Sequence, residues 1–161
     1  GLAKLMGGRR KFVEKLQMVF DEGLYDPANE PDIAYAYLFS HFRGEEWRTQ
    51  KETRRLLDKY FTTAPDGIPG NDDTGTMSAW AVFTMLGLYP DCPGEPYYTL
   101  TAPVFDRAEI DTDGGTLVIE KRGEGYIRKM TLGDKPLTKY RVGHDELLRG
   151  GKLTFELKNE R

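Results

Sequence analysis

The sequence predicts an α+β fold in which helices come first and strands follow. Apolar residues recur at helical spacing in the first half of the chain. Short runs rich in β-branched and aromatic residues fill the second half, and glycine-containing turns separate those runs. Because the two kinds of element are segregated along the chain, we expect a boundary near residue 95 between a helical part and a small antiparallel β subdomain.

Composition restricts the classes of function. The chain has 161 residues, of which 39% are apolar and 30% charged, and no apolar run approaches the ~20 residues that cross a bilayer. A membrane span is therefore excluded. The net charge of −3 gives no basic footprint for nucleic acid. With one cysteine and two histidines, an internal disulfide and a soft-metal site are excluded, so a bound metal would prefer oxygen ligands.

The first predicted helix spans residues 9–22 and ends at Gly23. Its apolar residues recur at i, i+4, i+7 and i+8, which is the spacing of one helical face: Phe12, Leu16, Val19 and Phe20. Residues 33–39 are apolar on every side, and this pattern indicates a helix that is buried all round, with a strand as the alternative.

Two further helices follow. Residues 49–52 form a capping box, so we expect a helix that begins at Thr49 and runs to Phe61. Another helix should run from Thr76 to Leu86, because Gly87 is a natural left-handed terminator.

The strands are predicted between glycine-rich turns in the second half of the chain. We expect five of them, near residues 97–101, 107–111, 116–121, 126–132 and 153–157.

The most concentrated acidic stretch lies in a glycine-proline loop just before the helix at Thr76. Asn71, Asp72 and Asp73 follow one another there, and Asp66 lies a few residues earlier. A helix cap needs only one side-chain oxygen, so this loop supplies more acceptors than a cap requires. Capping and turn formation is one interpretation, and a metal or acid/base role is the other.

A second acidic loop precedes the apolar run at 33–39. It carries Asn29 and Glu30 between two prolines, and Asp32 is the expected capping residue there. Each loop therefore comes before a buried helix. One hypothesis is that both are ordinary caps, and the other is that they converge at one end of a helical bundle.

The motifs of these loops resemble a known family. They include Asn-Glu-Pro-Asp-Ile at 29–33, Gly-Asn-Asp-Asp-Thr-Gly at 70–75 and Met-Ser-Ala-Trp at 77–80, with matching stretches on either side. Together they resemble the C-terminal part of glycoside hydrolase family 92, whose members are exo-acting α-mannosidases. The likeness covers nearly the whole chain and is sharpest over residues 66–90.

The resemblance implies a fold and a chemistry. Residues 1–95 would be the closing helices of an (α/α)6 toroid and residues 96–161 a β-rich C-terminal subdomain. The family hydrolyses terminal mannose with inversion and needs calcium beside that sugar. α-1,2 linkages of N-glycans are the expected substrate, and a secreted or periplasmic bacterial location is expected.

The resemblance also assigns roles to residues. Asp73 is the expected general base, with Asp72 beside it as the second catalytic carboxylate. Expected sugar contacts are Asn71, Asp66 and Glu30, and expected calcium ligands are Asn29, Glu30 and Asp73. The family's general acid is a glutamate upstream of these motifs, and no position in this chain corresponds to it.

We therefore expect a C-terminal fragment of a calcium-dependent α-mannosidase that is inactive by itself. Its exposed helix faces would be covered by the rest of the parent polypeptide or by self-association. The alternatives are a non-catalytic carbohydrate-binding or interaction module of α+β fold, and a structural calcium-binding domain.

Overall fold

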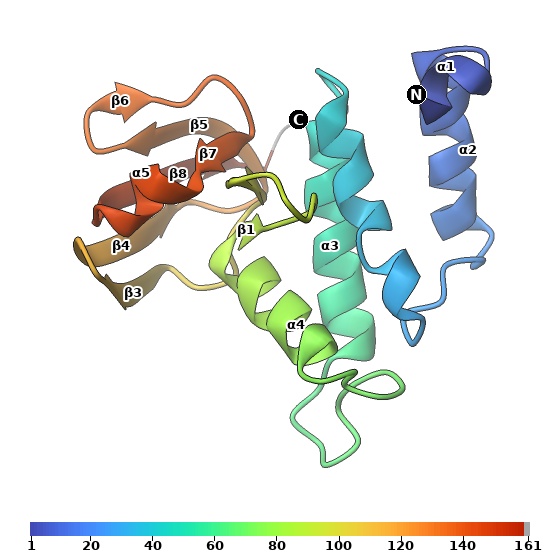
Figure 1. Cartoon of the computed structure of the whole chain (residues 1–161), viewed down its shortest axis with the longest axis horizontal. Coiled ribbons are helices and arrows are strands. Elements are labelled where there is room, and N and C mark those ends of the chain that lie inside the picture. The colour runs from blue at the N-terminus through green and yellow to red at the C-terminus, as the bar shows by residue number, and fades with distance from the viewer. Residues whose placement is uncertain (160–161) are drawn as a thin grey trace. The chain divides into compact units, whose positions relative to one another are not determined.

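A computed structural model describes residues 1–159 as two compact units. The N-terminal unit comprises Gly1–Ser78 and the C-terminal unit starts at Ala79. Helices occupy the first unit, and strands fill most of the second (Figure 1). The predicted segregation of helices and strands along the chain is therefore confirmed, whereas the toroid and the domain boundary near residue 95 stay predictions.

The N-terminal unit is built from α-helices and two 3-10 helices. In chain order these are α1 (Leu2–Leu5), α2 (Arg9–Asp21), η1 (Glu30–Asp32), η2 (Tyr35–His41), α3 (Glu46–Tyr60) and the start of α4 (Thr76–Leu86). The predicted helices over 9–22 and 76–86 are confirmed.

Apolar side chains from three of these helices form the core of the unit. The ring of Phe20 on α2 lies 5.9 Å from that of Phe39 on η2 and 5.2 Å from that of Tyr25. Leu56 and Leu57 on α3 are buried as well. Burying a large apolar side chain contributes about 1.5–3 kcal/mol, so these contacts fix the helices whose ends carry the two acidic loops.

A buried polar network joins α2 to α3 inside this core. Glu52 is only 1% exposed. Its Oε1 accepts a hydrogen bond of 3.0 Å from Gln17, and its Oε2 lies 2.7 Å from Nε of Arg55. Gln17 also accepts a bond of 2.7 Å from Arg48. Every polar atom of the Glu52 carboxylate is thus paired, which is the condition for keeping a charge in a core.

Two local predictions for this unit were wrong in detail. The apolar run after residue 33 is a 3-10 helix rather than an α-helix, and aromatic residues with weak α-helix propensity fill it. The capping box was assigned to the wrong residue, because α3 already begins at Glu46. Thr49 is fully buried, and its hydroxyl accepts a hydrogen bond of 2.9 Å from Ser40 on η2.

The C-terminal unit contains two sheets and a short helix. The strands are β1 (Leu88–Tyr89), β2 (Tyr97–Leu100), β3 (Arg107–Thr112), β4 (Gly115–Arg122), β5 (Tyr126–Leu132), β6 (Lys135–Pro136), β7 (Arg141–Gly143) and β8 (Gly151–Lys158), with α5 (His144–Leu148) before β8. All five predicted strands are confirmed, and the short β1, β6 and β7 were not predicted.

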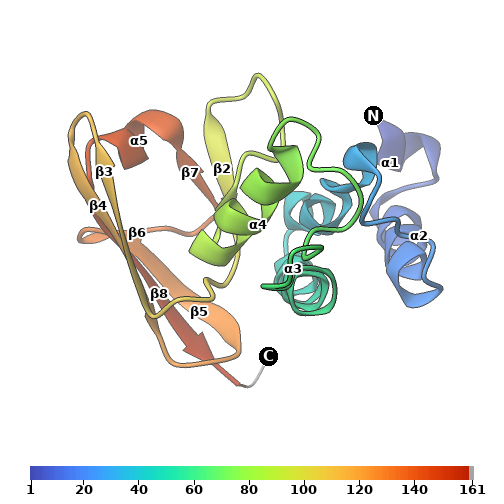
Figure 2. The same cartoon turned by 90° about the horizontal axis from the view of Figure 1, so that it is seen from below.

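The sheets pair in the order β1-β2-β7 and β3-β4-β8-β5-β6 (Figures 1 and 2). All ladders are antiparallel as expected, except that β4 pairs with β8 in parallel. Buried and partly exposed positions alternate along β4, and Ile119 on β4 and Leu153 and Phe155 on β8 lie in the core of this unit. This alternation is the reason that β4 could be predicted from the sequence.

The N-terminal unit leaves one apolar groove open. It is lined by Leu2, Met6, Phe12, Lys15, Leu16, Val19, Tyr35 and Leu38. Leu5 on α1 is 86% exposed. No helix among residues 1–159 has the length and apolar character to cross a membrane.

Replacing the buried glutamate tests the network that joins α2 to α3. We expect Glu52→Ala to lower the free energy of unfolding by about 2–4 kcal/mol, because it leaves Gln17 and Arg55 without their acceptor. Asp58→Ala is the matched control on the same helix: its exposed pair with Arg54 is worth about 0.5 kcal/mol or less. Urea unfolding followed by circular dichroism measures both, and equal losses would contradict the network's role.

Candidate functional site

Asp72 caps the helix α4. Its Oδ1 accepts a hydrogen bond of 2.7 Å from the backbone N–H of Ser78, and its backbone carbonyl accepts one of 3.2 Å from Met77. Both donors belong to the first turn of α4, where backbone N–H groups otherwise lack partners. The capping interpretation of the acidic loop is therefore correct for Asp72.

Asp73 has a different environment. Its backbone is left-handed, with φ of 48°, and so is that of Thr74, with φ of 62°. Such a conformation costs roughly 1–2 kcal/mol in most residues that carry a Cβ, such as Thr74, and less in an aspartate; strain of this kind clusters at functional sites. The backbone carbonyl of Asp73 is fixed by the hydroxyl of Thr76 at 2.7 Å. Its side chain is exposed, and no residue in 1–159 donates a hydrogen bond to the carboxylate.

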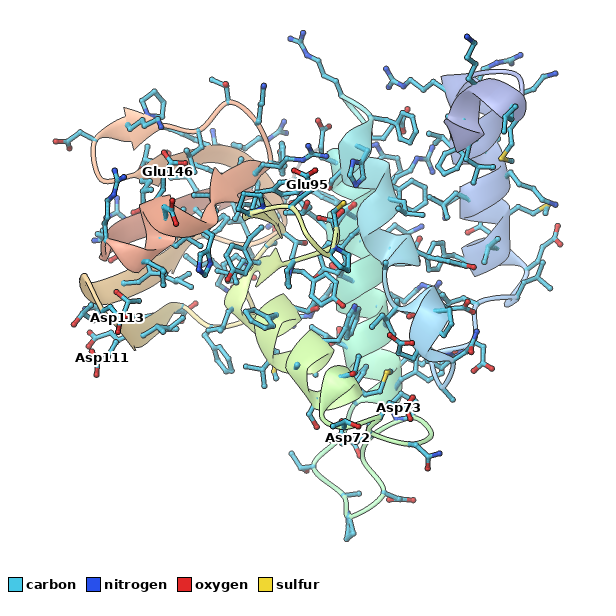
Figure 3. The ribbon with its side chains drawn as sticks, viewed as in Figure 1. Asp72, Asp73, Glu95, Asp111, Asp113 and Glu146 are labelled. Carbon is cyan, nitrogen blue, oxygen red and sulfur yellow. The ribbon has the colours of Figure 1, made fainter. Side chains whose placement is uncertain are left out.

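The two carboxylates therefore have separate tasks. Asp72 is half-buried and committed to the helix, whereas Asp73 presents an unpaired carboxylate to its surroundings. Both lie at the N-terminal end of α4 (Figure 3), where the helix dipole favours negative charge. A carboxylate that is held by its backbone and free at its oxygens is suited to accept a proton.

The second acidic loop is organised by Asp26 and Asp32. The carboxylate of Asp26 accepts a bond of 2.9 Å from the N–H of Ala28. The carboxylate of Asp32 accepts one of 3.2 Å from the N–H of Asp26 and another of 3.2 Å from the side-chain amide of Asn29. The prediction that Asp32 caps the following helix was therefore wrong: η2 begins at Tyr35 without a side-chain cap, and the Asp32 carboxylate instead forms a clasp, a pair of hydrogen bonds across the loop.

Tyr35 contributes to the same clasp. The negative charge of Asp32 raises the pKa of the Tyr35 phenol, and burial and a hydrogen bond to Asp32 raise it further. The phenol thus adds a donor to the Asp32 carboxylate that organises this loop. Glu30 and Asn29 are exposed, and the side-chain amide nitrogen of Asn29 is occupied by Asp32.

The two acidic loops touch at Gly70 and Ala28. A Cβ placed on Gly70 would lie 2.7 Å from Cβ of Ala28, 3.2 Å from its Cα and 3.3 Å from its carbonyl oxygen. Gly70 comes directly before Asn71, and Ala28 comes directly before Asn29. The expected convergence of the two loops therefore has a structural basis. It brings together the stretches that carry five of the six expected site residues: Asn71, Asp72 and Asp73 on one loop, and Asn29 and Glu30 on the other.

Asp66 lies apart from this contact. It belongs to a turn that closes on itself, with hydrogen bonds of 2.9 Å from Thr62 to Gly67 and from Gly67 to Ala64. Asp66 is exposed on that turn. Its role as a sugar contact stays a prediction, as do the roles assigned to the other site residues.

The expected ligands offer the oxygen atoms that calcium prefers, but they are too few to complete its coordination. Among residues 1–159, no group of three or more His, Cys, Asp or Glu side chains could hold a metal ion. Calcium takes about 6–8 oxygen ligands, and Asn29, Glu30 and Asp73 would supply only some of them. On their own, the described residues do not form a complete calcium site.

Sequence reasoning gave Asp32 only a capping role and did not identify Gly70 or Asp26 as parts of the site. Asp26 is the first residue of an Asp-Pro-Ala sequence, a composition typical of an Asx turn, so this signal was available. Nothing in the sequence alone indicates that Gly70 meets Ala28, because the contact joins residues more than forty positions apart.

Comparison with known proteins identifies relatives. Residues 1–159 match the sequence model of the glycosyl hydrolase family 92 catalytic domain. A protein of Arthroderma benhamiae described as an uncharacterized secreted glycosidase is 33% identical over 167 residues, which cover 99% of this chain and 21% of that protein.

Two solved structures from Bacteroides thetaiotaomicron are similar in fold. A family 92 α-mannosidase is 28% identical with a TM-score of 0.84, covering 95% of this chain and 22% of its own. An inverting family 92 mannosidase of strain VPI-5482 is 28% identical with a TM-score of 0.85, covering 98% and 25%. The chain thus spans about a fifth to a quarter of the length of these relatives.

Substitutions of Asp72 and Asp73 distinguish the stability that the helix cap contributes from the cost of the left-handed backbone. We expect Asp72→Ala to lower the free energy of unfolding by about 1 kcal/mol through loss of the cap, and Asp72→Asn to lose little of it. Asp73→Gly should keep stability within about 0.5 kcal/mol or raise it, because glycine adopts a left-handed backbone without strain. Urea unfolding measures the three variants, and an equal loss in Asp72→Ala and Asp73→Gly would contradict this division.

Proposed function

The chain belongs to glycosyl hydrolase family 92, and we propose that it supplies the base side of the active site of an inverting exo-α-mannosidase. The names of the solved relatives support the substrate class, since both are mannosidases and one is described as inverting. The observation that carries the proposal is the exposed, unpaired carboxylate of Asp73 on a left-handed backbone beside the Asn29–Glu30 loop.

In the proposed reaction Asp73 removes a proton from water. The water oxygen forms a bond to the anomeric carbon as the bond from that carbon to the leaving oxygen breaks, and the leaving oxygen takes a proton from a carboxylic acid. An inverting glycosidase holds its two carboxyl groups about 6.5–9.5 Å apart, so that the water fits beside the base. We assign the acid to a glutamate of the parent protein outside this chain.

The neighbouring residues would orient the base and the sugar. Asp72, committed to Ser78, holds the start of α4 in place beneath Asp73. Asn71 and Glu30 are exposed on the two touching loops, so their side chains suit contact with sugar hydroxyls. Asp66 is proposed as a more distant sugar contact from its own turn.

Calcium is proposed as a partner of this site in the parent protein. Asn29, Glu30 and Asp73 would contribute oxygen ligands, and the remaining ligands would come from water, the sugar or other parts of the parent. When bound, the ion would hold sugar hydroxyls and favour distortion of the ring.

The wider setting follows from the same proposal. Terminal α-1,2-linked mannose of N-glycans is the proposed substrate, and secretion is the proposed location, since one relative is described as secreted. The open apolar groove beside α2 is proposed to be covered by the rest of the parent polypeptide or by a second copy of the chain.

Hydrolysis by the full-length parent tests the base. We expect release of mannose with inversion, observed as the anomer first formed in proton NMR, and a fall in kcat of about 10²–10⁴-fold in Asp73→Asn. Asp113→Asn, on the exposed β3–β4 hairpin (Figure 3), is the control and should keep full activity. The 161-residue chain by itself should be inactive. A retained anomer, or an unchanged kcat in Asp73→Asn, would refute the proposal.

Removal of calcium tests the metal. Chelation of the full-length parent with EGTA should abolish hydrolysis, and added calcium should restore it. Glu30→Gln removes one charged ligand, so calorimetry should report a lower calcium affinity for this variant than for the unmodified parent. Activity that persists after complete chelation would remove calcium from the account.

A further inference from the structure

We propose that Gly70 and Ala28 form a spacer that sets the distance between the Asp73 base and the Asn29–Glu30 loop. This inference rests on the proposed function, because it gives the two residues a positioning role in that site. Neither residue carries a group that could react. Their small size lets the two loops approach each other closely.

The contact is too close for any side chain at position 70. The nearest atom to a Cβ there would be the Cβ of Ala28 at 2.7 Å, a distance at which something must shift. Ala28 has no flexible side chain to move aside, since its Cβ is attached directly to the backbone. A larger residue at position 70 therefore has to displace one loop relative to the other.

Both loops are fixed, so such a displacement would reach the site residues. On one side, the N–H of Ala28 is bound to the carboxylate of Asp26, and the N–H of Asn29 is bound to the carbonyl of Asp26 at 3.2 Å. On the other side, the carbonyl of Asp73 accepts from the hydroxyl of Thr76. Two residues separate Gly70 from Asp73, and one separates Ala28 from Glu30. The spacer thus lies next to both halves of the site.

Backbone conformation at Gly70 must be separated from the contact itself. Gly70 has φ of 68°, which already favours glycine. Gly23, after α2, has nearly the same φ of 69°, and a Cβ there would meet no atom within 4 Å. Gly23→Ala therefore introduces the same conformational strain without a steric conflict, and it is the matched control for stability.

The test is a kinetic comparison in the full-length parent. Gly70→Ala should lower kcat about 10- to 100-fold, because a shift of about 1 Å in a catalytic group has an effect of this size, while KM changes less. Gly23→Ala should keep the kcat of the unmodified enzyme. Ala28→Gly deletes the closest obstructing atom but leaves φ at position 70 unchanged, so the double variant Ala28→Gly/Gly70→Ala should recover most of the lost kcat.

Each outcome decides the inference. Recovery in the double variant supports the spacer, since Ala28→Gly removes the atom that lies nearest to the new Cβ at position 70. A kcat that is equally low in the single and double variants overturns the spacer and leaves backbone strain as the cause. Full activity of Gly70→Ala overturns it too. If the unmodified parent does not hydrolyse α-mannosides, the proposed function fails and the spacer's catalytic role with it.

Discussion

The close approach of Gly70 to Ala28 is the contact on which the proposed site depends. It joins two loops that lie far apart in the sequence, and each loop carries oxygen-rich side chains immediately after the contact. The helices behind the loops are held by buried apolar side chains and by the Glu52 network. Without this contact, the two acidic loops would be separate, and helix capping alone would explain the acidic residues of each.

Within one of these loops, adjacent aspartates divide the work. Asp72 satisfies the first turn of α4, and this bond holds the chain at the point where the backbone turns left-handed. Met77, four residues after Asp73, is buried and anchors the helix start. The strain of the left-handed backbone, roughly 1–2 kcal/mol at Thr74 and less at Asp73, is therefore offset by the cap and by burial. The result is a carboxylate whose position is fixed while its oxygens stay unpaired.

The sequence was sufficient where local pattern and tertiary packing agree. The amphipathic face of α2 and the alternation along β4 predict their elements, because burial follows the period of each structure. The run at Tyr35–His41 is a 3-10 helix, and its aromatic residues have weak α-helix propensity, which the apolar pattern alone does not reveal. The buried position of Thr49 depends on Ser40, and so local capping rules could not detect it.

Part of the site could also be predicted from the sequence. Resemblance to family motifs selects the stretches at 29–33 and 70–75, and the excess of acceptors over what a cap needs draws attention to Asp72 and Asp73. Local sequence does not distinguish the two aspartates, because the distinction arises from a backbone that turns left-handed at Asp73 and from a bond to Ser78. The spacer could not be predicted, because a glycine in a loop can serve many purposes and only the folded structure shows that Gly70 meets Ala28.

The most direct test of this account is a nuclear Overhauser measurement on the 161-residue chain with assigned methyl and Hα resonances. The contact predicts a strong cross-peak between the methyl group of Ala28 and an Hα of Gly70, because a Cβ at that Hα position would lie 2.7 Å from the methyl carbon. Absence of this cross-peak, with both resonances sharp and the neighbouring contacts of α2 and α3 observed, would contradict the convergence of the two loops.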